Sequence, residues 1–257
     1  MPQETTNLSL VEYFFDGIDF VDKLILDAGT GPGQTTERLV NRVIEVGKSS
    51  RIISVDHNQK ALDNVRNELG DKAEVVQFVK ADLADMPQVQ SSSLDIIACT
   101  DVLCMVEMRP LRSMKVLSEF KRMLKPEGKL IIGEQVPTPK ATVPKEQVWA
   151  RRWQLVKAMN HLLEQRHLEE ITPEDLEFCL ATLGFDSIRW SIFEGEDFGN
   201  SVEWGLRRPL DTAKRLSDEL LQEALVKQID ELRNIFAQHG GAFLPYYVMH
   251  ARKKLCR

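Results

Sequence analysis

Short apolar runs alternate with longer amphipathic segments over the first half of the chain. The apolar runs predict buried strands near residues 23–27, 51–55, 75–79, 94–99 and 129–134. Apolar residues at helical spacing predict helices near residues 34–47, 58–69 and 110–124. The sequence Lys125-Pro126-Glu127-Gly128 predicts a turn between the third of these helices and the fifth strand. Because strands alternate with helices, we expect a parallel sheet with right-handed crossover connections.

The second half of the chain continues the alternation at longer intervals. Thr172 and Pro173 predict the start of a helix, with Thr172 as its cap and Pro173 at its first position. This helix should end at Gly184, where glycine can close the last turn. Strands should follow at Ser187–Phe193 and Phe243–Lys253.

Composition limits the classes of protein to which the chain can belong. Its 257 residues, of which 43% are hydrophobic, can build one large core or one core plus a cap. The formal net charge of −6 argues against binding to nucleic-acid phosphates. The cysteines Cys99, Cys104, Cys179 and Cys256 lack Cys-x-x-Cys spacing, which argues against zinc and disulfides and suits a reducing cytoplasm.

The chain also lacks the sequence patterns of export and of membrane insertion. The N-terminal segment has no basic region followed by an apolar one, as a signal peptide would. No run approaches the roughly 20 apolar residues that a membrane-spanning helix needs. We therefore expect a cytoplasmic protein that does not associate with a membrane.

The main chemical signal lies in Leu24–Thr36, which has the sequence LILDAGTGPGQTT. Its apolar run ends in a loop that contains Gly29, Gly31 and Gly33, and a helix-compatible segment follows. Glycine lets the backbone approach a ligand closely, and the helix N-terminus behind the loop offers unpaired N–H groups. The spacing is Gly-x-Gly-x-Gly, whereas dinucleotide-binding loops have Gly-x-Gly-x-x-Gly.

Asp56 ends the second predicted strand and supports a nucleoside ligand. An acid at this point can accept hydrogen bonds from ribose hydroxyls. A nucleoside without phosphates would need this acid and the glycine loop, but no pyrophosphate clamp. Adenosine attached to a sulfonium amino acid fits that description.

At this point the chain resembles the class I S-adenosylmethionine-dependent methyltransferases, from about Val21 to Arg189. The resemblance rests on five landmarks in order: LDAGTGPG (Leu26–Gly33), ISVDHNQKAL (Ile53–Leu62), VKADLADMP (Val79–Pro87), LDIIACTDVL (Leu94–Leu103) and MLKPEGKLIIGE (Met123–Glu134). It implies an α/β fold with a Rossmann-like, doubly wound, seven-stranded sheet. That sheet would be mostly parallel, with the last strand antiparallel and inserted between strands five and six. Residues 1–257 would then form a single methyltransferase domain.

The resemblance also implies which residues bind S-adenosylmethionine and its product, S-adenosylhomocysteine. They are Asp27, Ala28, Gly29, Thr30, Gly31, Gly33, Asp56, His57, Asp82, Leu83 and Thr100. Asp27 and Thr100 would lie near the methionine moiety, Asp56 at the ribose, and the turn at Asp82 near the adenine. Structural roles stay open: a charge partner at a helix N-terminus for Asp27, a helix cap for Asp56, and an Asx-turn for Asp82.

Candidates for the acceptor side are fewer. Asp101 and Glu134 end the fourth and fifth predicted strands and are the candidate catalytic residues, although Asp101 could instead cap a loop. No metal is expected. In-line displacement of the sulfonium depends mainly on orienting the reactants, which can supply roughly 7–11 kcal/mol. A general base is needed only where the acceptor must lose a proton early.

Two segments are longer than the sheet requires, and we expect them to form helical insertions. Residues 136–171 and 194–241 would provide a lid and the acceptor region, because ligands bind beyond the carboxyl ends of such strands. The second segment carries an apolar stripe at helical spacing: Leu216, Leu220, Leu221, Leu225, Ile229, Leu232 and Phe236. The stripe could equally be additional core or a homodimer interface through residues 210–239.

Absent motifs favour a small-molecule methyl acceptor. No Asn-Pro-Pro-Tyr or Asp-Pro-Pro-Tyr follows the fourth strand, and the chain has no Pro-Cys nucleophile and no basic tract. The alternatives are a protein or RNA methyltransferase and a non-catalytic S-adenosylmethionine-binding regulator. An NAD(P)-dependent oxidoreductase is disfavoured, because no tyrosine is followed four residues later by lysine.

Overall fold

The computed structural model describes residues 6–47, 49–106, 112–138, 141–163 and 168–255. These residues fold as two compact units. Unit 1 comprises residues 1–134, 171–191 and 247–257, and unit 2 comprises residues 135–170 and 192–246. Each unit has its own core and is described separately.

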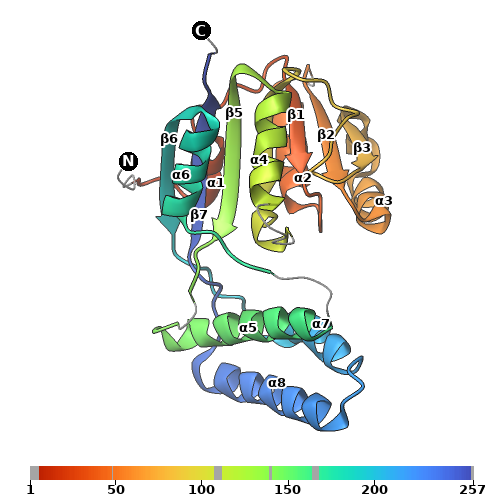
Figure 1. Ribbon diagram of the computed structural model, residues 1–257, viewed down its shortest axis with the longest axis vertical. Coiled ribbons are helices and arrows are strands. Elements are labelled where there is room, and N and C mark those ends of the chain that lie inside the picture. Colours follow the sequence, from red (N-terminus) through yellow and green to blue (C-terminus); the bar gives the residue numbers. More distant parts are fainter. Residues whose placement is uncertain (1–5, 48, 107–111, 139–140, 164–167, 256–257) are drawn as a thin grey trace. The chain divides into compact units, whose positions relative to one another are not determined.

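Unit 1 is built on a seven-stranded sheet with the strand order β3-β2-β1-β4-β5-β7-β6. Its strands are β1 (Leu24–Ala28), β2 (Arg51–Asp56), β3 (Val76–Lys80), β4 (Leu94–Thr100), β5 (Leu124–Gln135), β6 (Phe185–Phe193) and β7 (Tyr246–Lys253). Six strands are parallel, and Figure 1 shows β7 running in the opposite direction to its neighbours. The predicted Rossmann-like fold is therefore confirmed, including the insertion of the last strand between strands five and six.

The helices of unit 1 follow the expected alternation. They are α1 (Leu10–Phe15), α2 (Gln34–Glu45), α3 (Gln59–Leu69), α4 (Arg112–Met123) and α6 (Pro173–Leu183), together with the 3₁₀ turns η1 (Gly70–Val75) and η2 (Leu103–Met105). Thr172 caps α6 as predicted, because its hydroxyl accepts from the N–H of Asp175, and Gly184 ends the helix with a φ of 86°. The start of the predicted 110–124 helix lies partly outside the described residues.

The core of unit 1 lies in the central parallel strands. β1 pairs in parallel with both β2 and β4. On the outer sides, β2 pairs in parallel with β3, and β4 pairs in parallel with β5. Ile25, Leu26, Ile97 and Leu130 are completely buried. A strand buried on both faces reads as a continuous apolar run, and this is why these strands are visible in the sequence.

Helix α1 is an element that the apolar pattern did not predict. Ser9 and Glu12 form a reciprocal capping box, in which each side chain accepts from the other residue's backbone N–H. The spacing Ser-x-x-Glu was the available signal for it. Tyr13 in this helix is buried, and its carbonyl oxygen lies 2.9 Å from Nε2 of His250 in β7.

The predicted turn at Lys125–Gly128 instead lies within β5. Leu94 of β4 pairs with Leu124, and the next pair joins Ile96 to Lys129, so the intervening residues form an irregularity in the strand. Glu127 accommodates it with a φ of 66°. The turn residues therefore bend the strand, whereas the sequence suggested that they precede it.

Unit 2 is helical and contains η3 (Pro144–Glu146), α5 (Gln147–Leu162), α7 (Glu203–Ala213) and α8 (Glu219–His239). From the predicted apolar stripe, Leu225, Ile229 and Leu232 are buried in its core with residues of α5 and α7. Leu220 alone among the seven stripe residues is strongly exposed, at 81%. The stripe thus serves the core of unit 2, and the homodimer through residues 210–239 stays a prediction.

Trp149 is the centre of an aromatic cluster within unit 2. Its ring lies 4.8 Å from that of Phe243 and 5.6 Å from that of Trp204. The guanidinium of Arg152 lies 4.2 Å from the Trp149 ring centroid, and its Nε donates to the carbonyl oxygen of Gly205.

No described helix in either unit combines the length and the apolar character that crossing a bilayer requires.

Candidate functional site

The glycine loop joins β1 to α2 and is held by the end of β2. The N–H groups of Gly29 and Thr30 both donate to the carbonyl oxygen of Val55, at 2.9 Å. Gly29, Gly31 and Gly33 have φ values of 90°, 50° and 90°, which side chains rarely tolerate. The loop therefore depends on glycine at all three positions.

The three glycines differ in their surroundings. A Cβ on Gly29 would lie 2.3 Å from Cγ2 of Val102, and one on Gly33 would lie 2.6 Å from Cγ2 of Val65. A Cβ on Gly31 would have the carbonyl oxygen of Gly29 as its nearest neighbour, at 3.9 Å. Gly29 and Gly33 thus permit close packing inside the protein, whereas Gly31 faces space that a ligand could occupy.

Asp56 lies at the end of β2 and is held by backbone N–H groups. Its Oδ2 accepts from the N–H of Gly31 and its Oδ1 from that of Asn58, each at 2.8 Å. The residue is 9% exposed, and Oδ2 retains a second lone pair for a hydroxyl donor. The cap predicted as an alternative is supplied by Asn58, whose side chain accepts from the N–H of Lys60.

His57 lies beside Asp56 on the surface. Its Nδ1 is 3.2 Å from Oδ1 of Asp56, and its side chain is 66% exposed. An adenine contact and a surface role are both compatible with this position.

Asp27 is buried at the end of β1 and joins three elements. Its Oδ2 accepts from the hydroxyl of Thr36 in α2 at 2.5 Å and from that of Ser54 in β2 at 2.8 Å. Burial raises the pKa of Asp27 to about 6, although these two hydrogen bonds oppose the shift. The Thr30 hydroxyl lies 2.7 Å from that of Ser54 and extends the same network. Asp27 and Thr30 therefore connect the loop to α2 and β2 by buried hydrogen bonds. Ala28, which follows Asp27, is also buried.

The predicted adenine turn follows β3 and contains an Asx-turn. Oδ1 of Asp82 accepts from the N–H of Ala84 at 3.0 Å, and its Oδ2 pairs with Arg112. Leu83 is half-buried. The carbonyl of Asp56 accepts from the N–H of Ala81, which ties the start of this turn to the ribose end of the site.

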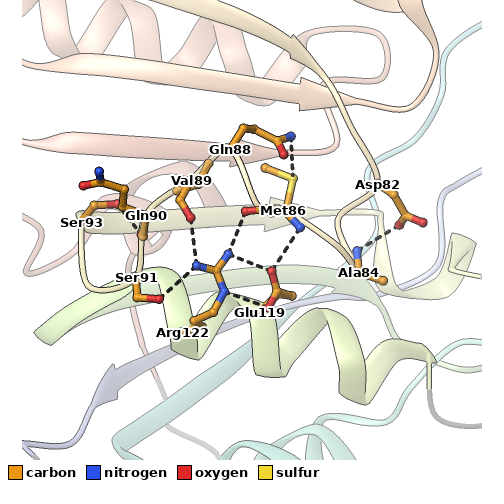
Figure 2. A network of polar contacts seen from close by, with 10 residues as sticks. All are labelled: Asp82, Ala84, Met86, Gln88, Val89, Gln90, Ser91, Ser93, Glu119 and Arg122. Carbon is orange, nitrogen blue, oxygen red and sulfur yellow. Dashed lines mark hydrogen bonds and ion pairs between the residues drawn. The ribbon is translucent and has the colours of Figure 1, made fainter.

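Arg122 anchors the segment that follows this turn. Figure 2 shows its guanidinium donating to the carbonyl oxygens of Met86 and Val89, at 2.8 and 2.9 Å. The same guanidinium forms a two-point ion pair with Glu119, whose carboxylate also accepts from the N–H of Met86. One side chain of α4 thus holds the backbone after the candidate adenine turn.

The ends of β4 and β5 carry the remaining predicted residues. The hydroxyl of Thr100 lies 2.5 Å from that of Thr35 at the start of α2. Asp101 is exposed with a φ of 54°, and its N–H donates to the carbonyl oxygen of Gly133. Oε1 of Glu134 accepts from the N–H groups of Val102 and Leu103, at 2.9 and 2.6 Å.

Glu134 is 1% exposed, and its Oε2 is buried with no hydrogen-bond partner among the residues that the structure describes. Burial, together with the nearby charge of Asp101, raises the pKa of Glu134 to about 8. A carboxyl group with such a pKa is mostly protonated at pH 7. Between the two catalytic candidates, the exposed Asp101 is the one that a ligand could reach.

The predicted residues thus gather at the carboxyl ends of the parallel strands, but several supporting residues were missed. Ser54 had a signal, since it is a polar residue inside an apolar strand. Val102 and Val65 had none, because their contacts with the loop glycines join distant parts of the chain. Among the residues that the structure describes, no group of three or more His, Cys, Asp or Glu side chains could hold a metal.

Comparisons with known proteins agree with this geometry. The family model described as a methyltransferase domain matches residues 26–132, which run from the middle of β1 through most of β5. The human thiol S-methyltransferase TMT1B is 36% identical over 103 residues, which cover 39% of this chain and 38% of the human protein. The rat protein of the same name is 35% identical over 103 residues.

Solved structures extend the likeness of fold over most of the chain. A cyclopropane-fatty-acyl-phospholipid synthase-like protein of Lactobacillus casei has a TM-score of 0.62 at 14% identity, and the match covers 90% of this chain and 85% of that one. Phosphoethanolamine N-methyltransferase 2 of Haemonchus contortus, in complex with S-adenosyl-L-methionine, has a TM-score of 0.56 at 16% identity. That match covers 96% of this chain and 51% of the other. Residues 26–132 thus match a methyltransferase domain, the sheet order and the glycine loop agree with that match, and over the rest of the chain the likeness is one of fold.

Proposed function

We propose that this protein binds S-adenosylmethionine at the carboxyl edge of its parallel sheet and transfers the methyl group to a small-molecule acceptor. The observation that carries the proposal is the hydrogen bond between the N–H of Gly31 and Asp56. This bond brings a carboxylate suited to ribose hydroxyls next to a glycine at which an added Cβ would overlap no other atom. Phosphate groups are not needed to explain either feature.

The residues present fit the methyl donor. Asp56 would accept from the ribose hydroxyls, and the backbone of Gly29–Gly33 would border the methionine moiety with Thr100. Asp82 and Leu83 would contact the adenine. When bound, S-adenosylmethionine supplies a methyl group on a sulfonium, from which an aligned nucleophile can displace it.

The rest of the chain would orient the acceptor and exclude water. The family match ends at residue 132, so residues 136–171 and 194–241 lie outside the matched domain. We assign acceptor recognition to these two segments, which form most of unit 2. Asp101 is the candidate that could take a proton from an acceptor.

Thiols are the acceptor class that we would test first. The human and rat relatives are named thiol S-methyltransferases, although the match spans only about two fifths of each chain. A free thiol has a pKa near ~8.5 and is partly ionised at neutral pH, so it depends little on a general base. This chemistry suits a site whose buried Glu134 is neutral.

Two measurements test the proposal. Calorimetry with S-adenosylmethionine, S-adenosylhomocysteine and NAD should show binding of the first two ligands only. Methyl transfer from labelled S-adenosylmethionine should then be assayed with small thiols, amines, phenols, and a protein and RNA extract as separate acceptors. Tight NAD binding without a response to S-adenosylhomocysteine would overturn the proposal, and labelling confined to protein or RNA would overturn the choice of acceptor.

A further inference from the structure

Glu134 is buried at the carboxyl end of β5 in an arrangement that the proposed reaction does not explain. One of its oxygens, Oε1, accepts two backbone N–H groups from the residues just after β4. The other oxygen, Oε2, is buried and has no hydrogen-bond partner within the described part of the chain. A buried polar atom without a partner has a cost in stability, so a native protein that contains one calls for an explanation.

The two N–H groups that Glu134 receives belong to Val102 and Leu103, and Val102 touches the glycine loop. Cγ2 of Val102 lies 2.3 Å from the point where a Cβ on Gly29 would stand. The isopropyl group therefore occupies the space that the missing side chain of Gly29 leaves. Because Oε1 fixes the backbone of Val102, it also fixes the surface on which Gly29 rests.

We propose that Glu134 is a positioning residue for the cofactor site, which holds Val102 against Gly29 and does so as a neutral carboxyl group. This inference rests on the proposed function of the glycine loop. Glu134 would not touch the methyl donor. It would act through Val102, which sets the path of the loop between β1 and α2.

The surroundings of Glu134 favour the neutral form. Asp101 at the end of β4 adds a negative charge that opposes ionisation, and burial opposes it more strongly. Cys104 in η2 hydrogen-bonds the carboxyl group and, with the two backbone N–H groups, opposes the rise in the pKa of Glu134, while Cys99 in β4 and Tyr247 in β7 lie within its electrostatic influence. Burial raises the pKa of both Cys99 and Tyr247 well above the usual range, so neither becomes charged at neutral pH. The Tyr247 hydroxyl already donates to the carbonyl oxygen of Ile171, at 3.0 Å.

Glu134→Gln and Glu134→Ala separate the two parts of the proposal. The glutamine amide retains a neutral acceptor for the two N–H groups and has the shape of a protonated carboxyl group. Alanine removes the acceptor altogether. The probe is S-adenosylhomocysteine, which carries no sulfonium charge that could attract an ionised carboxylate directly.

At pH 7 we expect Glu134→Gln to bind S-adenosylhomocysteine within about twofold of the unmodified protein, and Glu134→Ala to bind it about tenfold more weakly. The ratio of the dissociation constants of the unmodified protein and Glu134→Gln should rise severalfold between pH 7 and pH 9.5, as Glu134 ionises. Comparison with glutamine cancels the titration of the ligand itself. Glu68→Gln, an exposed change on α3, is the matched control and should follow the unmodified protein at every pH.

Three results would overturn the proposal. Binding by Glu134→Gln that is as weak as binding by Glu134→Ala at pH 7 would show that the ionised form is required. Unchanged binding by a folded Glu134→Ala would show that the hydrogen bonds do not position the loop. If Glu134→Ala does not fold, Val102→Ala tests the same link and should weaken binding about fivefold, so unchanged binding there would also refute it. Failure of the unmodified protein to bind S-adenosylhomocysteine would instead refute the proposed function.

Discussion

The backbone N–H of Gly31 donates to Oδ2 of Asp56, with 2.8 Å between nitrogen and oxygen. The bond joins the middle of the glycine loop to the end of β2. The bond orients the carboxylate of Asp56, and Oδ2 keeps a second lone pair that can accept a hydrogen bond from a ligand. The loop and the candidate ribose acceptor are therefore positioned by one contact, and a change in either residue should affect both.

Asp56→Ala should weaken the binding of S-adenosylhomocysteine by about 1–3 kcal/mol. The change removes a charged acceptor from the ribose hydroxyls and also releases the N–H of Gly31. Calorimetry at pH 7 measures the effect. Asp71→Ala, at an exposed acid in η1, is the control and should leave affinity unchanged. Equal affinity of Asp56→Ala and the unmodified protein would show that the nucleoside binds elsewhere.

Gly29→Ala should destabilise the protein much more than Gly47→Ala. Both glycines have φ near 90°, so the backbone strain of about 1–2 kcal/mol is shared. A Cβ at position 29 would also overlap Val102, whereas one at position 47 would meet nothing within 4 Å. The overlap should add about 1–3 kcal/mol to the loss in unfolding free energy, measured by urea denaturation. Equal losses in the two variants would mean that Val102 yields without cost.

Glu134 should make the free energy of unfolding depend on pH between its ordinary pKa of 4.5 and its folded-state pKa of about 8. Its pKa is about 8 in the folded protein, against an ordinary value of 4.5, so between these values the folded state binds more protons than the unfolded state. The free energy of unfolding must therefore fall as pH rises through this window. Glu134→Gln cannot lose a proton, so its melting temperature should rise relative to that of the unmodified protein from pH 5 to pH 8. Parallel melting curves across that range would contradict the assignment.

Arg122→Lys should lower the free energy of unfolding by about 1–3 kcal/mol. Lysine cannot reach the carbonyl oxygens of Met86 and Val89 together with both oxygens of Glu119, which the guanidinium contacts at once (Figure 2). Arg38→Lys, an exposed change on α2, should alter stability by no more than about 0.5 kcal/mol. The prediction is wrong if the two variants unfold at the same denaturant concentration.

Several elements could be predicted because their signals are local. β1, β2 and β4 are buried on both faces, so each appears as an apolar run of strand length. Asp56 was predicted from its place after such a run, and the structure puts its carboxylate against the glycine loop. Helix α1 was missed although its capping box is equally local, because its apolar residues are too few to form a periodic pattern.

The sequence by itself determined the order of strands and helices, the glycine loop and the acids at the strand ends, since the pattern for each of these lies within a few consecutive residues. Only the tertiary structure decided what supports them. Val102 lies on Gly29, Glu134 holds Val102, and Leu225, Ile229 and Leu232 of α8 pack in the core of unit 2, so residues distant in the chain meet in each case. No local pattern encodes such pairs, because they form only when the sheet brings the strand ends together. The raised pKa of Glu134 follows from the same assembly, since its burial and the nearby charge of Asp101 are properties of the folded chain.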